Sequence, residues 1–413
     1  TEVESLDGAA GHFSASLTTQ PRYIDPGKCT GCGQCAQVCP VLCVNEFNCS
    51  LDQRKATSIL YAQAVPLVYS IDRNACIGCG ICETVCLAKA IRYDDEPHRA
   101  TIEVGAVVLA TGDEVFNPSL YDTYGYESLP HVITSLEFER ILSASGPFRG
   151  HLMRPYDREE PSKIAWLQCV GSRDRKIDNP YCSSVCCMYA IKEAVIAKEH
   201  AHSSLDAAIF FMDIRTHGKD FERYYERARD EGVRFIRSRV HSLVPAANGD
   251  VEILYVEENG EQRSEVFNLV VLSVGFQSGR ETAEMAQRLG IELDSYRFVK
   301  TDSFTPVATS RPGVYVCGAV QGPKDIPQSV MEASAAAAAA GVQLKDVRGS
   351  QTRKRELPAQ TNVFGEPPRI GVFVCQCGIN IGGVVNVPEV REYARTLPYV
   401  VYVEDNLYTC SQD

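Results

Sequence analysis

The chain has 413 residues, of which 45% are hydrophobic and 23% charged, so it can form two or three globular domains and is neither disordered nor collagen-like. Its formal net charge of −12 argues against a nucleic-acid partner, because phosphate backbones are bound by clustered lysine and arginine. No apolar run is long enough to span a membrane, and the N-terminal segment shows no basic region followed by an apolar one. We therefore expect a cytoplasmic protein.

Residues 24–95 contain two copies of a cysteine motif. The first copy, C-x2-C-x2-C-x3-C-P, starts at Cys29, and the second starts at Cys76. Each copy predicts a short strand, a tight loop and a helical turn. Three thiolates on one loop can cap three corners of a cubane, and in two-cluster ferredoxins the fourth ligand comes from the other copy. We assign two [4Fe–4S] clusters on this basis: one to Cys29, Cys32, Cys35 and Cys86, and one to Cys76, Cys79, Cys82 and Cys39.

Two other uses of these cysteines fit the sequence less well. A disulfide framework is typical of small secreted domains, and this chain is long and shows no export signal. Zinc prefers two C-x2-C pairs around one tetrahedral ion, which differs from this triplet-plus-one pattern. Cys43 and Cys49 fall outside the repeat, and we interpret them as packed thiols.

Beyond the repeats, apolar strands alternate with helices. Residues 101–112 predict one buried strand that ends in a turn of small residues. Further strands are expected at 164–170, 207–214, 251–257 and 269–274, with helices at 182–200 and 221–231. This alternation predicts a parallel sheet flanked by helices. The alanine run 335–340 predicts a helix interior, and the polar segment 348–369 predicts a linker before a strand at 370–374.

A second set of thiols follows the strand at 164–170. Cys169, Cys182, Cys186 and Cys187 have the spacing C-x12-C-x3-C-C. On a helix that includes Cys182, this residue and Cys186 would share one face. The residues alone leave two interpretations open, a third cluster or a group of packed or redox-active thiols. A last set, Cys375, Cys377 and Cys410, has only three members.

Two strand ends predict close approach of the backbone to a dinucleotide. The first is Ala110, Thr111 and Gly112, and the second ends in Gly318 and Ala319. A helix that begins after residue 322 could direct its N–H groups at a pyrophosphate or a flavin. The candidate contacts at its start are Lys324, Asp325 and Ile326. Close packing of a helix on a sheet explains the same small residues equally well.

Together these residues resemble the A-subunit family of heterodisulfide reductases, which are FAD and iron–sulfur proteins of methanogens with relatives in other anaerobes. The segments that carry the resemblance are 28–35, 45–66, 168–173, 181–188 and 321–327. The resemblance implies an α/β fold, in which a thioredoxin-reductase-like flavoprotein sheet carries an inserted two-cluster [4Fe–4S] ferredoxin module. It also implies that Cys169, Cys182, Cys186 and Cys187 bind a third [4Fe–4S] cluster.

The resemblance also predicts the order of the domains. The expected order is a remnant of the FAD-binding domain at 1–23, the ferredoxin insert at 24–95, the flavin domain with the third cluster at 96–347, the linker at 348–369, and a truncated second copy of the family's N-terminal module at 370–413. The family's N-terminal module and first G-x-G-x-x-G motif do not precede the insert, so the sequence resembles a piece of a longer chain. Cys375, Cys377 and Cys410 would then be ligands of an incomplete fourth cluster.

The implied function is that of an oxidoreductase subunit in which FAD passes, and bifurcates, electrons among the clusters. The implied partners are ferredoxin, other heterodisulfide-reductase-type subunits and an electron-input hydrogenase or dehydrogenase subunit, within a complex that contains a homo-oligomer. Lys192, beyond Cys187 on the expected helix, is our candidate catalytic residue, because a cation near flavin N5 would stabilise anionic reduced flavin. The alternative for Lys192 is a solvated lysine or a partner of Glu193.

Two other functions fit parts of the sequence. One is a non-catalytic iron–sulfur electron-transfer module without bound flavin. The other is a glutamate-synthase-type flavoprotein that uses NADPH. The second is disfavoured because residues 168–173 carry a cysteine where a nicotinamide-binding phosphate loop would lie.

Overall fold

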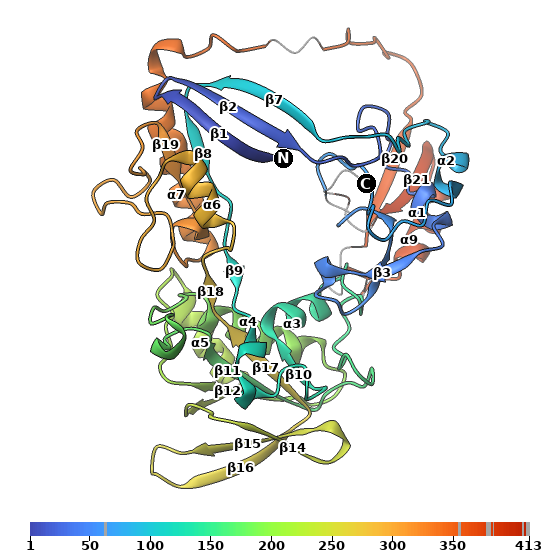
Figure 1. Ribbon diagram of the computed structural model, residues 1–413. Helices are drawn as coiled ribbons and strands as arrows, with labels where there is room; N and C mark the ends of the chain where they lie inside the picture. Colours follow the sequence, from blue (N-terminus) through green and yellow to red (C-terminus); the bar gives the residue numbers. More distant parts are fainter. Residues whose placement is uncertain (62–63, 354–356, 377–380, 383, 407–408, 410–413) are drawn as a thin grey trace. The chain divides into compact units, whose positions relative to one another are not determined.

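The structure is a computed structural model of residues 1–413, and it describes the chain outside residues 62–63, 354–356, 377–380, 383, 407–408 and 410–413. The chain forms two compact units (Figure 1). Unit 1 consists of residues 1–19, 98–138 and 152–351, and unit 2 of residues 20–97, 139–151 and 352–413. Residues 20–97 are therefore inserted into the sequence of unit 1.

A five-stranded parallel sheet with the order β10-β17-β11-β12-β13 forms the centre of unit 1. Its strands are β10 (Val132–Thr134), β11 (Lys163–Val170), β12 (Asp206–Phe211), β13 (Arg234–Arg237) and β17 (Leu269–Val274). All six residues of β17 are buried, as expected for a strand covered on both faces. The predicted parallel sheet is thus confirmed.

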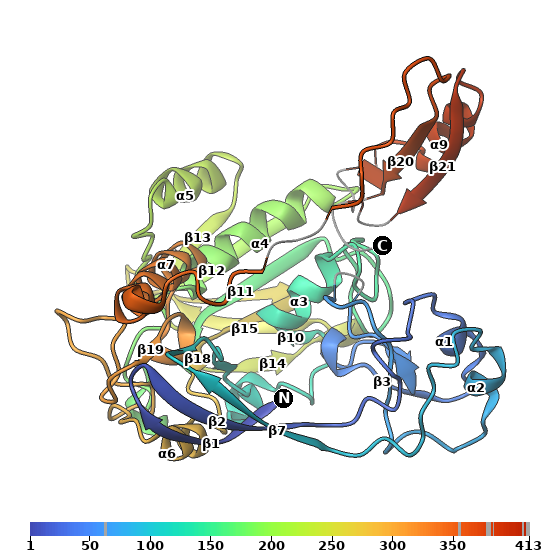
Figure 2. The same cartoon turned by 90° about the horizontal axis from the view of Figure 1, so that it is seen from above.

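Helices α3 (Ser135–Leu142), α4 (Cys186–His200) and α5 (Phe221–Asp230) connect these strands. Figure 2 shows α4 and α5 on one side of β11, β12 and β13. The helix expected from residue 182 begins only at Cys186, because Ser184 has a left-handed φ of 62°. The prediction that Cys182 and Cys186 share a helical face is therefore wrong.

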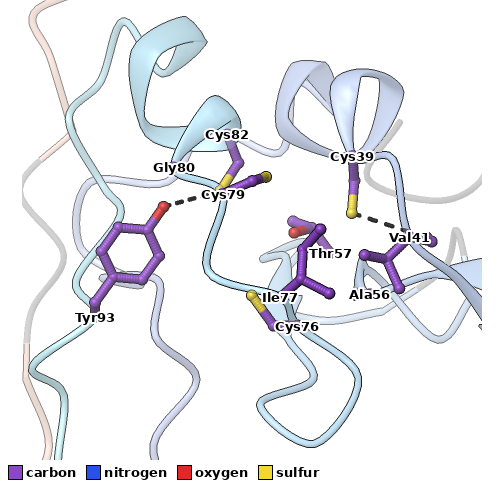
Figure 3. Close-up of a pocket in the computed structure, with 10 residues that line it drawn as sticks. All are labelled: Cys39, Val41, Ala56, Thr57, Cys76, Ile77, Cys79, Gly80, Cys82 and Tyr93. Atoms are coloured by element: carbon purple, nitrogen blue, oxygen red, sulfur yellow. Dashed lines mark hydrogen bonds between the residues drawn. The ribbon is translucent and has the colours of Figure 1, made fainter.

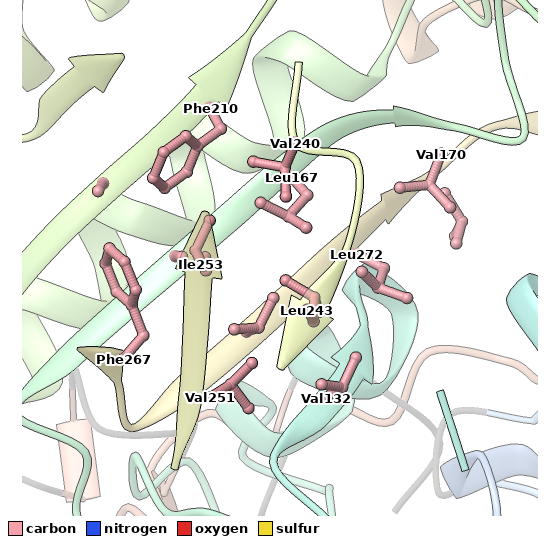
Figure 4. Packing of buried hydrophobic residues seen from close by; sticks show 14 of the residues in the cluster. Val132, Leu167, Val170, Phe210, Val240, Leu243, Val251, Ile253, Phe267 and Leu272 are labelled. Carbon is pink, nitrogen blue, oxygen red and sulfur yellow. The ribbon is translucent and has the colours of Figure 1, made fainter. Parts of the chain in front are cut away.

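The other face of the parallel sheet packs against a separate antiparallel sheet. This sheet contains β14 (Leu243–Pro245), β15 (Val251–Val256) and β16 (Gln262–Phe267). Leu167 and Leu272 of the parallel sheet share one buried cluster with Ile253 and Phe267 (Figure 4). The strand expected at 251–257 exists, but it belongs to this covering sheet and not to the parallel one.

Unit 1 also contains shorter sheets near the candidate flavin residues. β1 (Glu2–Ala9), β2 (His12–Thr19) and β7 (His98–Val104) are antiparallel, β8 (Val107–Leu109) pairs in parallel with β19 (Val314–Val316), and β9 (Glu114–Val115) pairs with β18 (Phe276–Gln277). The helices here are α6 (Thr282–Leu289) and α7 (Ile326–Gln343), and the second contains the alanine run.

The single buried strand expected at 101–112 is wrong. β7 is exposed over six of its seven residues, and residues 105–106 interrupt the strand before β8 begins. The break falls at Gly105, where a Cβ atom would lie 2.3 Å from Leu344 Cδ2. This neighbour is far away in the sequence, so the sequence pattern gave no sign of it.

The cysteine repeat folds into the first part of unit 2. Its elements are α1 (Gln34–Val38), β3 (Leu42–Val44), β4 (Gln53–Lys55), β5 (Thr57–Ser58), β6 (Ser70–Ile71) and α2 (Ile81–Val85). In the first copy the expected strand is reduced to a single antiparallel bridge between Ile24 and Ile91. Ile24, Val68 and Ile71 form a small buried core here, together with several cysteines.

The last part of unit 2 is a parallel pair of strands joined by a helix. β20 (Ile370–Cys375) pairs with β21 (Val400–Asn406), and α9 (Val387–Arg395) connects them. The strand predicted at 370–374 is confirmed. The described residues between 348 and 369 contain no helix or strand. Within the described residues, none of the helices combines the length and apolar character that crossing a lipid bilayer requires.

Candidate cysteine and flavin sites

One pocket in unit 2 is lined by cysteines from both copies of the repeat. Cys39 comes from the first copy, and Cys76, Cys79 and Cys82 come from the second (Figure 3). The Cys82 Sγ lies 3.2 Å from the Tyr93 hydroxyl. The four thiols that the spacing assigned to one cluster therefore surround one pocket.

The loop around this pocket is shaped by glycine. Gly80 has a φ of 76° and directly precedes α2, and Gly78 has a φ of 71°. The Gly78 N–H donates to Cys76 Sγ over 3.4 Å. A non-glycine residue would be strained in this left-handed conformation. The glycines therefore allow the backbone to turn around the thiols and to direct an N–H group at sulfur.

Cys39 enters the pocket from the end of α1. Burial raises the pKa of its thiol, but hydrogen bonds with Thr57 and Val41 outweigh burial, and the net pKa is lowered. The thiolate is the form that binds metal. The protein groups around Cys39 thus favour the ligand form.

The other four cysteines of the repeat are also neighbours. Cys29, Cys35 and Cys86 pack against the same buried core, while Cys32 is exposed. Burial, with a smaller contribution from the nearby Cys29 and Cys32, raises the pKa of Cys35 to about 11. The Ala90 N–H donates to Cys86 Sγ over 3.3 Å.

A second pocket, in unit 1, is lined by the C-x12-C-x3-C-C set. Cys169, Cys182, Cys186 and Cys187 all border it. Cys169 reaches the pocket from the end of β11, where the pairing with β17 shifts register between Leu167 and Val170 and Cys169 has a φ of 64°. Burial raises the pKa of Cys187 to about 11 and raises the pKa of Cys186 further. A buried thiol set of this kind needs a cation or a metal group to hold it ionised.

Two buried serines join the loops that carry these cysteines. The Ser183 N–H donates to Ser172 Oγ over 3.0 Å, and Ser172 Oγ donates to the Tyr181 carbonyl over 3.1 Å. The Phe276 N–H donates to Ser183 Oγ over 2.9 Å. Sequence reasoning did not single out these serines, although both lie beside the cysteines of the motif.

The thiols surround pockets and do not converge on one point. Among the described residues, no three His, Cys, Asp or Glu side chains are arranged to hold a single metal ion. Cys377 and Cys410 lie outside the described residues, and Cys375 is the half-buried last residue of β20. The three-cysteine site expected there is therefore not described.

The candidate flavin residues follow two paired strands. The Cys317 N–H donates to the Leu109 carbonyl over 2.9 Å, so Ala110 and Gly318 follow at the same end of the β8–β19 pair. Thr111 and Gly112 line a cavity of about 380 Å³ between β8 and α6. Asp113 also lines it, and burial raises the pKa of Asp113 to about 6.

Ala319 directly follows Gly318, and the remaining candidate flavin residues lie at the start of α7. Asp325 caps the helix and accepts a 2.8 Å hydrogen bond from the Gln328 N–H, and Ile326 is exposed. Lys324 is buried, and its Nζ lies 2.6 Å from Glu332 Oε2. The Gly318 N–H donates to the same Glu332 oxygen over 3.1 Å. The charge of Lys324 is therefore balanced within the protein.

Lys192 lies in α4 and is half-buried. Its neighbour Glu193 is buried and accepts a 2.8 Å hydrogen bond from Trp166 Nε1. The structure places Lys192 outside the described lining of the thiol pocket and of the cavity beside β8.

Comparisons with known families match both parts of this arrangement. Residues 188–340 match the family described as pyridine nucleotide-disulphide oxidoreductase. Residues 22–45 and 69–92 match the family described as 4Fe-4S binding domain. The match to the 4Fe-4S binding domain covers both copies of the cysteine repeat, so the repeat is an iron–sulfur motif.

Curated relatives align with most of the chain. The A subunit of the H(2)/formate:CoB-CoM heterodisulfide,ferredoxin reductase of Methanococcus maripaludis is 44% identical over 346 residues, which are 83% of this chain and 52% of that protein. The iron-sulfur A subunit of the CoB--CoM heterodisulfide reductase of Methanocaldococcus jannaschii is 42% identical over the same shares. The chain belongs to the A-subunit family of heterodisulfide reductases. It spans about half the length of the curated relatives it matches.

The A-subunit family accounts for the fold expected from the sequence. A flavoprotein-type sheet with an inserted ferredoxin module is confirmed by the two family matches and the sheet topology. Among solved structures, T. acidophilum thioredoxin reductase aligns with 61% of this chain and 69% of its own, at 15% identity and a TM-score of 0.39. This score is too low to add support.

Proposed function

We propose that the chain is the FAD and iron–sulfur part of a heterodisulfide-reductase-like complex. In this proposal it passes electrons between FAD, [4Fe–4S] clusters, ferredoxin and partner subunits. The observation that carries the proposal is the pair of pockets, each lined by four cysteines in the sets that the spacing predicted. Thiolates are the ligands that iron–sulfur clusters prefer, and clusters of this kind carry single electrons.

The match of residues 188–340 to pyridine nucleotide-disulphide oxidoreductases supports a flavin beside the clusters. FAD, when bound, exchanges electrons in pairs or singly and so links two-electron reactants to one-electron carriers. The names of the relatives state hydrogen, formate and ferredoxin as reactants. We infer that this chain likewise receives electrons from a partner hydrogenase or dehydrogenase and divides them between ferredoxin and a second acceptor, as part of a homo-oligomeric complex.

The residues available to hold FAD are those at the ends of β8 and β19. Ala110, Thr111, Gly112, Gly318 and Ala319 offer backbone groups without bulky side chains. The start of α7, at Asp325 and Ile326, lies directly beyond the β19 end. We propose that the positive charge of Lys192 stabilises the anionic reduced states of the flavin, in which case Lys192→Ala lowers the reduction potential of the flavin and changes its semiquinone signal.

The first test is the iron and flavin content of the anaerobically purified chain. Three [4Fe–4S] clusters predict about 12 iron atoms per chain, and the ferredoxin clusters alone predict about 8. Iron near 12 with about one FAD supports the flavin-centred subunit. Iron near 12 without flavin would favour an electron-transfer module, and iron near 8 would contradict the third cluster.

A further inference from the structure

The pocket in unit 1 that Cys169, Cys182, Cys186 and Cys187 line, called here the unit 1 cysteine pocket, also contains a group of charges that none of the sequence motifs predicts. Arg173 follows the bulge of β11, and Asp213 and Arg215 follow the end of β12. Arg173 Nη1 pairs with Asp213 Oδ1, and Arg215 Nη2 lies 3.3 Å from Asp213 Oδ2. One carboxylate therefore joins two guanidinium groups, one from each side.

Each guanidinium group faces a different cysteine. Burial raises the pKa of the Cys169 thiol, and the Arg173 guanidinium, which forms a side-chain hydrogen bond with this thiol, offsets only part of the rise. The Arg215 guanidinium forms a side-chain hydrogen bond with Cys182. Burial lowers the pKa of Arg215, but the charges of Cys182 and Asp213 outweigh burial and raise it. The two arginines thus direct N–H donors at two of the four candidate ligands.

The charges of this group do not cancel. Two guanidinium groups and one carboxylate leave an excess of one positive charge beside the thiols. All three side chains are partly shielded from water, with Arg173 only 24% exposed. Charges act more strongly in such a site than in bulk water.

The described lining of the pocket in unit 2, which Cys39, Cys76, Cys79 and Cys82 border, contains no such group of charged side chains. Its described lining is Val41, Ala56, Thr57, Ile77, Gly80 and Tyr93 besides the four cysteines, without arginine or lysine. The two arginines thus distinguish the pocket in unit 1 from the cysteine pocket in unit 2.

A [4Fe–4S] cluster with four thiolates is an anion, and reduction adds one negative charge. Hydrogen bonds to its sulfur atoms and nearby positive charge favour the reduced form and raise its potential. We propose that Arg173 and Arg215, joined by Asp213, are positioning residues that raise the reduction potential of the cluster bound by Cys169, Cys182, Cys186 and Cys187. This inference rests on the proposed function, because it requires the third cluster.

A purely structural role for the same residues is the competing explanation. The ion pairs also tie the loop after β11 to the loop after β12 and would stabilise both loops with or without a cluster. A structural role predicts altered thermal stability without a shift in potential. The reduction potential therefore distinguishes the two roles.

The test is a redox titration of the purified chain, followed by electron paramagnetic resonance of each cluster. Arg173→Gln and Arg215→Gln should each lower the potential of the third cluster, and Asp213→Asn should raise it, because this change removes the opposing charge. The signals of the ferredoxin clusters should not move. Arg263→Gln is the matched control, because Arg263 is exposed on β16 and pairs with Glu257 and Glu261, outside the pocket.

Unchanged third-cluster potentials in both glutamine variants, at full iron content, would overturn the proposal. If a glutamine variant loses about four iron atoms, it has lost the third cluster and its potential cannot be measured. Arg173→Lys and Asp213→Asn then test the tuning role. Arg173→Lys keeps the charge and should keep most of the potential, and a potential of Asp213→Asn at or below that of the wild type would refute the tuning role. Iron near 8 in the wild-type chain would instead refute the third cluster itself.

Discussion

Gly171 fixes the turn between β11 and the unit 1 cysteine pocket. Its φ is 72°, and a Cβ atom would lie 2.0 Å from Cγ of Phe116. Phe116 is buried in the core beneath the parallel sheet, so it cannot move aside without disturbing other side chains. At this position glycine is required both by the backbone conformation and by the space available.

We expect Gly171→Ala to destabilise unit 1 and to disturb the unit 1 cysteine pocket. Left-handed strain of about 1–2 kcal/mol and overpacking of about 1–3 kcal/mol add at this site. The melting temperature should fall by several degrees, and cluster iron should fall with it. Gly232→Ala is the control, because Gly232 has a φ of 81° but nothing within 4 Å of a Cβ atom. Equal losses in the two variants would show that only strain matters.

At the scale of single residues, the sequence predicted the cysteines better than their surroundings. Cys76, Cys79 and Cys82 lie within a few residues of one another, so local geometry keeps them together. Arg173 and Asp213 reach their pocket from different strands. Their meeting depends on the pairing of β11 with β12, which the spacing of residues along the chain does not reveal.

At the scale of elements, the start of α7 is fastened to its own second turn. Lys324 precedes the helix, and Glu332 lies within it, and the two side chains are 3% and 11% exposed. Glu332 also accepts the Gly318 N–H, so the pair joins α7 to the end of β19. A buried ion pair of this kind is costly to break on one side only.

We expect Lys324→Met to destabilise unit 1 by about 3–5 kcal/mol, because it leaves the Glu332 carboxylate buried without its cation. The double variant Lys324→Met with Glu332→Leu should recover most of this loss, since both charges are then removed. Thermal unfolding measures the stability, and a separate FAD titration measures flavin binding. A double variant as unstable as the single one would contradict the structural role of the pair.

For the strands, too, the sequence predicted some features and missed others. The apolar runs at 164–170 and 269–274 predicted β11 and β17 because both strands are buried on two faces. The run at 101–112 did not form the single strand expected, because β7 ends just before Gly105, where the backbone passes so close to Leu344 that a Cβ atom would clash. The periodicity of a segment reports its burial but not which distant residues it meets.

At the scale of the whole molecule, the cysteine sets are divided between the two units. The eight cysteines of the repeat belong to unit 2, and Cys169, Cys182, Cys186 and Cys187 belong to unit 1. Each unit has its own buried core. Cysteines of the repeat pack in the core of unit 2, and Cys186 and Cys187 are buried within unit 1. Loss of one set should therefore leave the other intact.

We expect Cys182→Ala to lower the iron content from about 12 to about 8 atoms per chain and to leave the ferredoxin signals unchanged. Cys43→Ala is the control, because Cys43 lies outside the motifs and donates to the Arg54 carbonyl over 3.5 Å. Its iron content should stay that of the wild type. Loss of all iron from the Cys182 variant would show that the sets depend on each other.

The sequence by itself determined the parallel sheet and the family and predicted the ligand sets of the repeat, because each depends on residues that are close together or repeat at a fixed spacing. Only the tertiary structure decided that Cys182 stands outside α4, that the strand at 251–256 covers the parallel sheet, and that Lys324 is neutralised by Glu332. It also decided which charged side chains line the unit 1 cysteine pocket. These features depend on contacts between distant segments, which form when the strands pair and the core closes.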